Sequence, residues 1–324
     1  MEFEFSIDKF FKEHGDIKTV GIAGHLSPDG DSIGSCLGLY LYLKKNYPGL
    51  KLDIFAESVP EELKLIKDSS EVNTQFASEV DVYDAFFILD TEKERSGGAE
   101  EFFDKAKLSV NIDHHISNTG SGMINILDPK ASSACEIVAS VLDTEKMDIE
   151  VAKALYIGMV TDTGIFHYSN TSPKTMRIAA SLMEFGFDHS SIIEHVELEK
   201  SFSQNRGLGE ALAAARLELG GKLVISSMSY EEILNKGLSS DDFGGAVSQM
   251  NLTIGAECSI FIKGTKDKKA KISLRSKEKV NVAEAAKALG GGGHMRAAGI
   301  ITDKPIDEVI DILTKKVREQ LESC

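Results

Sequence analysis

The sequence predicts an α/β protein whose first domain contains a mostly parallel sheet and whose second, smaller domain is α+β. Short apolar runs alternate with helical stretches from residue 18 to residue 129, a pattern typical of parallel strands covered on both faces. A polar, helix-prone stretch follows at roughly 188–218. The segments before this stretch alternate strands and helices, whereas those after it are mainly strands with a glycine run. We therefore expect a first domain over 1–190, a helical linker over 191–218 and a second domain over 219–324.

The elements of the first domain can be assigned in order. Its expected strands are short apolar, β-rich runs, at 18–24, 52–57, 84–90, 108–113 and 123–129. Its expected helices lie between and after these strands, at 32–47, 100–107, 134–143, 150–160 and 173–185. The helix at 32–47 has apolar residues at helical spacing and stops at Pro48-Gly49.

The second domain reads as a smaller mixture of strands and helix. Its expected strands lie at 222–229, 259–264, 270–276 and 297–303. A helix is expected over NVAEAAKALG (281–290), and a run of four glycines begins at its end. Neither domain contains an internal repeat or a low-complexity segment.

Composition limits the possible functions. A net charge of −15 argues against a protein that coats long nucleic acid, although a small anionic substrate can still bind at a local positive site. The four cysteines are scattered, and the acidic N-terminus does not read as a signal peptide. No apolar run approaches the roughly 20 residues that span a bilayer. We therefore expect a cytoplasmic protein with reduced thiols and no membrane partner.

The first chemically suggestive segment is HLSPDGDSIGS (25–35), between the first strand and the first long helix. In open α/β sheets, ligands bind at the carboxyl ends of the strands. Pro28 and Gly30 bend the backbone, so that Asp29 and Asp31 can face one point beside His25. The alternative is that this segment is only a turn and that Asp31 caps the helix. That alternative does not explain a histidine at the strand end.

Three further positions carry acids or histidines where an element ends. Asp90 closes an apolar strand, where a buried carboxylate is costly unless it is paired or bound to metal. Asp113, His114 and His115 follow another apolar strand; one imidazole could bind metal while the other reaches substrate. Asp162 lies in TDTG (161–164) at a helix end. Turn formation at Asp90 and helix capping at TDTG are the simpler alternatives.

The combination favours a metal centre over four unrelated turns. A parallel sheet would bring these strand ends together, and their oxygen-rich donors with one or two imidazoles suit Mn²⁺ better than Zn²⁺. Six ligands are too many for one catalytic ion with an open position, but they suit two ions about 4 Å apart. We expect two Mn²⁺ ions, with Co²⁺ or Mg²⁺ as possible substitutes.

Taken in order, these motifs resemble those of the DHH phosphoesterase family, and the glycine-rich segment GGGGHMRAAG (290–299) resembles its associated C-terminal domain. The likeness runs from about residue 18 to residue 302. It implies one metal site made by His25, Asp29 and Asp90. It implies a second site that shares Asp90, made by Asp31, Asp90, His114 and Asp162. It also implies that His115 lies near the scissile phosphate and that Asp113 supports the histidines.

The glycine run has two interpretations. Four glycines alone favour a flexible linker. Their place between a helix and a strand favours a loop whose backbone N–H groups approach an anion. The resemblance implies that this loop binds the substrate's phosphate or terminal nucleotide, through Gly291, Gly292, Gly293 and His294. We expect Arg275 to be the paired guanidinium, within a segment, 263–279, that is rich in basic residues.

The two-domain layout without further modules resembles stand-alone nanoRNases and pAp phosphatases. This implies a phosphoesterase that hydrolyses short oligoribonucleotides, 3'-phosphoadenosine 5'-phosphate (pAp), or both, in a cleft between the domains. Hydrolysis of cyclic di-AMP or its linear product pApA is the nearest alternative. A non-catalytic nucleotide-binding module is the alternative from another class, and all six expected ligands argue against it. The preferred substrate, the cleavage polarity and the existence of a homodimer are left open.

Overall fold

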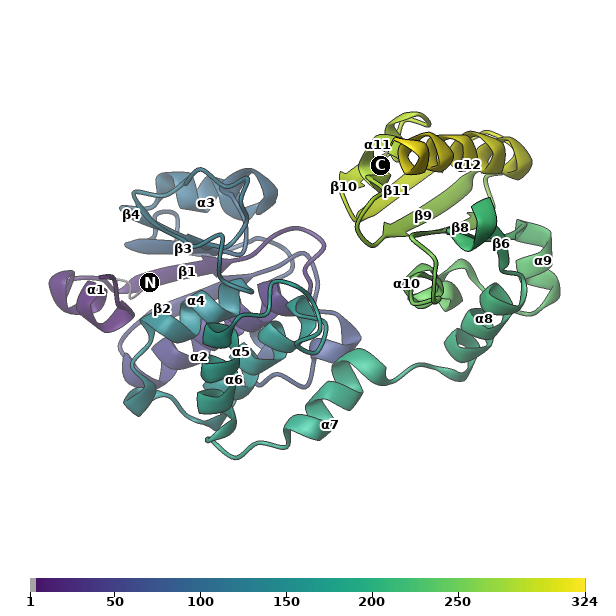
Figure 1. The fold of residues 1–324 in the computed structure, drawn as a ribbon. Coiled ribbons are helices and arrows are strands. Elements are labelled where there is room, and N and C mark those ends of the chain that lie inside the picture. The colour runs from purple at the N-terminus through teal and green to yellow at the C-terminus, as the bar shows by residue number, and fades with distance from the viewer. Residues whose placement is uncertain (1–3, 324) are drawn as a thin grey trace. The chain divides into compact units, whose positions relative to one another are not determined.

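The computed structural model describes residues 4–323 and divides the chain into two compact units. The first unit ends at Glu199 and the second begins at Lys200, a position inside the stretch expected to form the linker. Figure 1 shows the course of the chain through both units. None of the helices in residues 4–323 is long and apolar enough to cross a membrane.

The first unit is built on a five-stranded sheet in the order β2-β1-β3-β4-β5. Its strands are β1 (Thr19–Ala23), β2 (Lys51–Phe55), β3 (Ala85–Leu89), β4 (Leu108–Asp113) and β5 (Ile124–Leu127). Every pairing between neighbours is parallel, so the expected α/β fold with a parallel sheet is confirmed. The carboxyl ends of all five strands therefore lie at one edge, which is where ligands bind in such sheets.

Helices cover both faces of this sheet (Figure 1). The helices of the first unit are α1 (Ile7–Glu13), α2 (Gly30–Asn46), α3 (Ala99–Lys105), α4 (Ala134–Val141), α5 (Ile149–Asp162), α6 (Pro173–Met183) and α7 (His189–Ile193). Along β3 the side chains alternate: Phe87 and Leu89 pack into the large core with α2, α4 and α5. Phe86 and Ile88 pack on the opposite face with Phe103 of α3. This burial on both faces explains why the strand sequences are almost continuously apolar.

The second unit has its own six-stranded sheet in the order β10-β11-β9-β8-β7-β6. Its strands are β6 (Arg216–Glu218), β7 (Leu223–Met228), β8 (Cys258–Gly264), β9 (Ala270–Ser276), β10 (Gly292–His294) and β11 (Ala297–Thr302). Its helices are α8 (Phe202–Ala213), α9 (Tyr230–Asn235), α10 (Ala246–Asn251), α11 (Val282–Lys287) and α12 (Ile306–Glu322). All strand pairs are antiparallel except β7 with β8, which confirms the α+β character expected here.

Two separate cores lie on the two faces of the second sheet. Ile260 and Ile262 of β8 pack with Leu313 of α12, whereas the intervening Phe261 packs in a cluster with α9 and α10. Helix α12 was not among the elements expected from the sequence. Helix α8 contributes Ala211 to the core beneath Phe261, so this part of the expected linker packs within the second unit.

Short single turns complete the chain between these elements. The 3-10 turns span Glu61–Leu63, Ser69–Glu71, Lys93–Arg95, Thr144–Lys146, Leu219–Gly221 and Ser240–Phe243. A π-helical turn spans Glu194–Leu198, at the end of the first unit. Three cysteines, Cys36, Cys135 and Cys258, are free and buried, whereas Cys324 lies outside the described residues.

The first unit depends on a close approach of α2 to α5. A Cβ atom at Gly34 would lie 2.7 Å from the backbone oxygen of Ala154. We expect Gly34→Ala to lower the free energy of unfolding of this unit by about 1–3 kcal/mol, because the two backbones must separate. Helix propensity alone would favour alanine by roughly 1 kcal/mol, so a loss of stability would identify the close contact.

Urea denaturation followed by circular dichroism measures this effect. Gly49→Ala is the matched control, because no atom lies within 4 Å of the added methyl group and its φ is not in the left-handed region. Equal midpoints for wild type and Gly34→Ala would show that the helices accommodate the methyl group without separating.

Candidate metal centre

The turn after β1 places His25 beside two carboxylates. Its Nε2 atom lies 3.6 Å from Oδ1 of Asp29 and 3.3 Å from Oδ2 of Asp90. Its Nδ1 atom lies 2.7 Å from the backbone oxygen of Leu26. Because a carbonyl oxygen only accepts, Nδ1 carries a proton and Nε2 is the nitrogen that faces the carboxylates. A histidine oriented in this way presents Nε2 to a cation.

The two aspartates that follow have different local roles. Asp29 caps α2, and its Oδ1 accepts the backbone N–H groups of Asp31 and Ser32, each at 3.1 Å. Asp31 is buried in the first turn, so the alternative that Asp31 is the cap is wrong. Its carboxylate accepts the N–H groups of Ala134 at 2.6 Å and Cys135 at 2.9 Å, at the start of α4. Burial, and then the nearby charge of Asp90, raise the pKa of Asp31 well above its ordinary value.

Asp90 lies between two histidines immediately after β3. It is 2% exposed, and its Oδ1 has no hydrogen-bond partner of good geometry, although His114 Nε2 is 3.4 Å away. Its other oxygen faces His25, so the two oxygens point towards two different imidazoles. The backbone of Asp90 has a φ of 59°, a left-handed conformation that is uncommon outside glycine. A strained, buried carboxylate with an unsatisfied oxygen is a strong candidate for a shared metal ligand.

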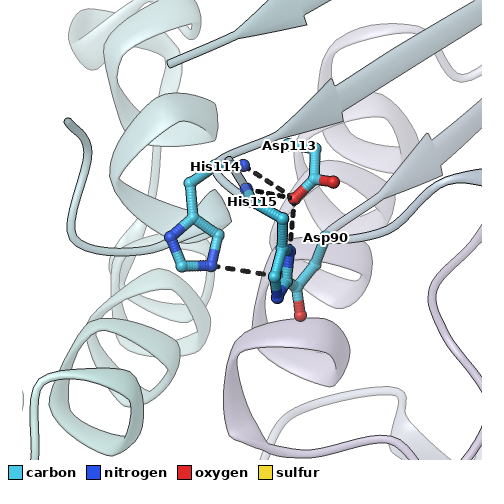
Figure 2. A group of neighbouring side chains, drawn as sticks. All are labelled: Asp90, Asp113, His114 and His115. Carbon is cyan, nitrogen blue, oxygen red and sulfur yellow. Dashed lines mark hydrogen bonds and ion pairs between the residues drawn. The ribbon is translucent and has the colours of Figure 1, made fainter. Parts of the chain in front are cut away.

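Asp113 holds the two adjacent histidines in place (Figure 2). Its Oδ1 accepts the backbone N–H groups of His114 and His115, at 2.7 and 3.1 Å, and lies 2.7 Å from Nδ1 of His115. Its Oδ2 accepts the amide of Asn118 at 2.6 Å. Burial alone would raise the pKa of Asp113, but His115 and Asn118 outweigh burial and lower it. With its acceptors engaged, Asp113 orients its neighbours, although its oxygens are also close enough to Asp90 and His114 to face the same cation.

His114 points to a second group of carboxylates. Its Nε2 lies 3.8 Å from Oδ2 of Asp162 and 3.9 Å from Oδ2 of Asp31. Asp162 is the last residue of α5, and the amide of Asn170 donates to its backbone oxygen at 3.1 Å. Burial raises the pKa of Asp162 to about 6, because the charges of Asp90 and Asp29 add to burial and outweigh the attraction of His114. His115, 38% exposed, is the more accessible of the two histidines.

All six expected ligands therefore lie in one cluster, in two groups. In each group, one donor atom per residue can be chosen so that all lie within 4.8 Å of one another. These two groups are His25 with Asp29 and Asp90, and Asp31 with His114 and Asp162; a third group joins Asp90 and His114 to Asp113 and His115. Burial opposes protonation of His25 and His114, but neighbouring carboxylates, Asp90 among them, raise both pKa values to about 10. Such concentrated negative charge, with an unsatisfied oxygen at its centre, fits divalent cations.

Sequence reasoning missed the amides that support this centre. Asn111, fully buried in β4, donates to the backbone oxygens of Ile88 at 3.1 Å and Thr91 at 2.8 Å. It also accepts the amide of Asn118 at 3.0 Å, so it links the turn at Asp90 to the loop after His115. The detectable signal was an asparagine inside the apolar strand LSVNID, where a polar side chain requires buried partners.

The glycine run of the second unit is structured, so the flexible-linker interpretation is wrong. Gly292, Gly293 and His294 form β10, which pairs with β11. A Cβ at Gly293 would lie 2.5 Å from the backbone oxygen of Ala297, and its φ is 141°. Gly291 makes a similarly close approach to Gly299. These glycines are needed for strand pairing, and their contact with an anion stays a prediction.

Arg275 and His294 lie near each other within the second sheet. Both are paired in register with Ala297, Arg275 from β9 and His294 from β10. Directly paired residues point to the same face of a sheet, so these two side chains emerge on one face roughly 10 Å apart. The Nη1 group of Arg275 donates to the backbone oxygen of Leu274 at 3.0 Å.

Comparison with known proteins agrees with this architecture. Residues 19–159 match the DHH family, N-terminal domain, and residues 220–323 match the DHHA1 domain. The bifunctional oligoribonuclease and PAP phosphatase NrnA of Thermus thermophilus is 29% identical over 93% of this chain and 89% of its own length. The cyclic-di-AMP phosphodiesterase PdeA of Listeria monocytogenes is 26% identical over 89% of this chain, but the match covers 46% of its length.

A solved structure shares the whole fold. The exopolyphosphatase-related protein of Bacteroides fragilis superposes with a TM-score of 0.85 and 26% identity, covering 97% of this chain and 95% of that one. Both domain matches, the parallel sheet and the clustered histidines and aspartates indicate the same protein family. The chain belongs to the DHH phosphoesterase family, and it is a hydrolase of phosphoester bonds with a DHH domain followed by a DHHA1 domain.

Proposed function

We propose that this protein is a Mn²⁺-dependent phosphoesterase that hydrolyses short oligoribonucleotides, pAp, or both. The observation that carries the proposal is the convergence of two groups of metal-binding atoms at Asp90. The similarity to a bifunctional oligoribonuclease and PAP phosphatase over nearly the whole chain supports the substrate class. The scattered, buried free thiols support a cytoplasmic location.

Mn²⁺ is the proposed ion because of the donor types. Each group offers two carboxylates and one imidazole, a set that suits Mn²⁺ better than thiolate-seeking Zn²⁺. One ion would be held by His25, Asp29 and Asp90, and the other by Asp31, Asp90, His114 and Asp162. Two such cations would lower the pKa of a bound water and offset charge on the phosphoryl group. Mg²⁺ and Co²⁺ are alternatives that a panel of metals separates.

His115 is the proposed contact to the scissile phosphate. Its Nδ1 faces Asp113, which leaves Nε2 as the donor for a phosphate oxygen. The hydrogen bond to Asp113 raises the pKa of His115 and favours the charged form that such a donor requires. Asp113 would act through this histidine by fixing the orientation of its ring.

The second unit is proposed to bind a phosphate or the terminal nucleotide of the substrate. Arg275 and His294 emerge on one face of its sheet, beside the glycines of β10. A guanidinium and an imidazole at this spacing can contact a terminal phosphate from two directions. This arrangement would favour short substrates with a phosphorylated end over long RNA.

A second candidate activity is hydrolysis of cyclic di-AMP or pApA. The similarity to the cyclic-di-AMP phosphodiesterase of Listeria monocytogenes favours it, because the match spans most of this chain. Release of product from pAp, pApA, cyclic di-AMP and a long single-stranded RNA, compared at equal concentration with Mn²⁺, separates the candidates. Binding of all of these ligands without hydrolysis would favour the non-catalytic alternative.

The shared position of Asp90 predicts a severe loss of activity on substitution. We expect Asp90→Ala or His114→Ala to lower kcat/KM for a ribodinucleotide by at least roughly 100-fold, because charge stabilisation at the phosphoryl group is lost. Asp81→Ala is the matched control, because the side chain of Asp81 is 91% exposed. Near-wild-type Mn²⁺-dependent cleavage by either site variant would contradict the proposal.

Metal binding is expected to release protons. His25 and His114, with pKa values of about 10, hold protons at neutral pH in the metal-free protein. A cation must displace these protons, so Mn²⁺ affinity should rise with pH between 6 and 9 and fall as the pH is lowered. Calorimetry at pH 7.5 in buffers of different ionisation enthalpy should show release of at least two protons, one from each histidine. The same heat of Mn²⁺ binding in all of these buffers would contradict this expectation.

Arg275 is expected to contribute to substrate binding. Arg275→Lys keeps the charge but loses the planar pair of donors, so KM for pAp should rise roughly 10-fold while kcat changes little. Steady-state kinetics at saturating Mn²⁺ measures both constants. The control is Lys266→Ala, a change at an exposed lysine in the turn between β8 and β9. A fall in kcat with an unchanged KM would exclude this role for Arg275.

A further inference from the structure

Glu136 is a fully buried carboxylate that belongs to neither group of candidate metal ligands. Its Oε2 accepts the N–H and the hydroxyl of Ser132, at 3.1 and 2.8 Å, and the hydroxyl of Thr175 at 2.7 Å. Its Oε1 has no hydrogen bond, although the ammonium of Lys174 is 3.4 Å away. Burial opposes ionisation, but the donors on Thr175 and Ser132 outweigh it and lower the pKa of Glu136. A buried charge with these hydrogen bonds holds in place the segments that carry its donors, which are the turn at Ser132 and the start of α6 at Thr175.

One of these donors, Ser132, belongs to the segment that holds Asp31, whereas Thr175 lies in α6. Residues 132–135 run from the turn before α4 into its first helical residues, and Glu136 anchors the turn through Ser132. The N–H groups of Ala134 and Cys135, immediately after this turn, are the donors to the two oxygens of Asp31. The position of the Asp31 carboxylate therefore depends on where Glu136 holds the start of α4.

The same turn also reaches Asp162, through one amide. Asn170 donates its Nδ2 hydrogens to the backbone oxygen of Ser132 at 2.9 Å and to that of Asp162 at 3.1 Å. The same nitrogen lies 3.5 Å from Oδ2 of Asp162, the oxygen that faces His114. Asn170 thus joins the turn anchored by Glu136 to the end of α5.

We propose that Glu136 and Asn170 are positioning residues for one of the two cation sites, the one formed by Asp31, His114 and Asp162. This inference rests on the proposed metal centre. The carboxylate of Asp31 is held by backbone N–H groups at the start of α4. Asp162 is tied to the turn before α4 through Asn170, which donates to its backbone oxygen and lies 3.5 Å from its carboxylate. Among the described residues, no hydrogen bond joins Glu136 or Asn170 to a member of the other group, His25, Asp29 and Asp90.

Loss of either positioning residue should weaken this site selectively. Without the amide of Asn170, the Asp162 carboxylate can turn away from Asp31, whose like charge repels it. Substitution of a residue that supports a metal ligand typically weakens metal affinity by roughly 10- to 100-fold. We expect a change of this size at one site and almost none at the other.

The experiment is a Mn²⁺ titration of the metal-free full-length chain, followed by calorimetry or by the electron spin resonance signal of free Mn²⁺. Wild type should bind two ions. Asn170→Ala and Glu136→Gln should each retain one ion with wild-type affinity and bind the second roughly 10- to 100-fold more weakly. Glu136→Gln preserves the shape of the side chain, and Asn170→Ala leaves Glu136 in place, so at least one variant is expected to fold. Ser140→Ala is the control, because among residues 4–323 the hydroxyl of Ser140 on α4 has one hydrogen bond, which it donates to the backbone oxygen of Glu136 at 2.8 Å.

A second set of proteins, each already lacking one metal ligand, identifies which of the two sites is affected. In a His25→Ala protein, which lacks a ligand of the other group, adding Asn170→Ala should weaken the remaining ion. In an Asp31→Ala protein, the same addition should leave the remaining affinity unchanged. Activity of the Asn170→Ala protein should recover as Mn²⁺ is raised, because the defect lies in occupancy, whereas a general loss of structure would not be reversed.

The outcomes separate the two proposals. Wild type that binds no Mn²⁺ would overturn the proposed metal centre itself. Wild type that binds two ions, with unchanged affinities in folded Asn170→Ala and Glu136→Gln, would overturn the positioning role. Equal weakening of both sites would also overturn it, because the role assigned here is specific to one site.

Discussion

Mutual repulsion between buried carboxylates is the constraint around which the first unit is organised. Asp31 and Asp90 are almost completely buried, and with Asp29 and Asp162 they surround the same two imidazoles. The sheet brings them together, because parallel strands end at one edge. Backbone N–H groups at the start of α4, amide side chains and the histidines then hold them at short range. Such an arrangement requires positive charge, whether from imidazolium or from divalent cations.

Much of this centre could be predicted because its residues stand where apolar strand sequences end in a polar side chain. His25, Asp90 and the run from Asp113 each follow an apolar strand, so the alternation of elements predicts both the fold and the residues that share an edge. The resemblance to the family then divided six ligands into two sets, and the distances place those donors in two neighbouring groups. The strand over Leu108–Asp113 was predicted with its correct ends, since a helical stretch precedes it and the polar pair His114-His115 follows it.

The supporting residues could not be predicted from local pattern. Asn170 and Glu136 act through partners that are 8 and 39 residues away in the chain, Asp162 and Thr175. Glu136 lies in an apolar helix, and only the fold shows that it faces inwards towards Ser132. Helix α12, by contrast, could have been predicted from local pattern, because its buried residues Val309, Leu313 and Val317 recur every four positions, at helical spacing. The glycine run misled in one respect, because strand pairing, and not mobility, explains Gly291 and Gly293.

The left-handed backbone at Asp90 limits what evolution or design can place there. Asparagine and aspartate are the residues other than glycine that adopt this conformation most readily, because their short polar side chains hydrogen-bond locally. A glutamate would add length where the side chain is enclosed, and a branched residue would clash with its own backbone. Asparagine is thus the substitute that keeps the main chain while removing the charge. Under the proposed function, Asp90→Asn would therefore give an inactive, correctly folded protein in which an uncleaved substrate could be captured and seen.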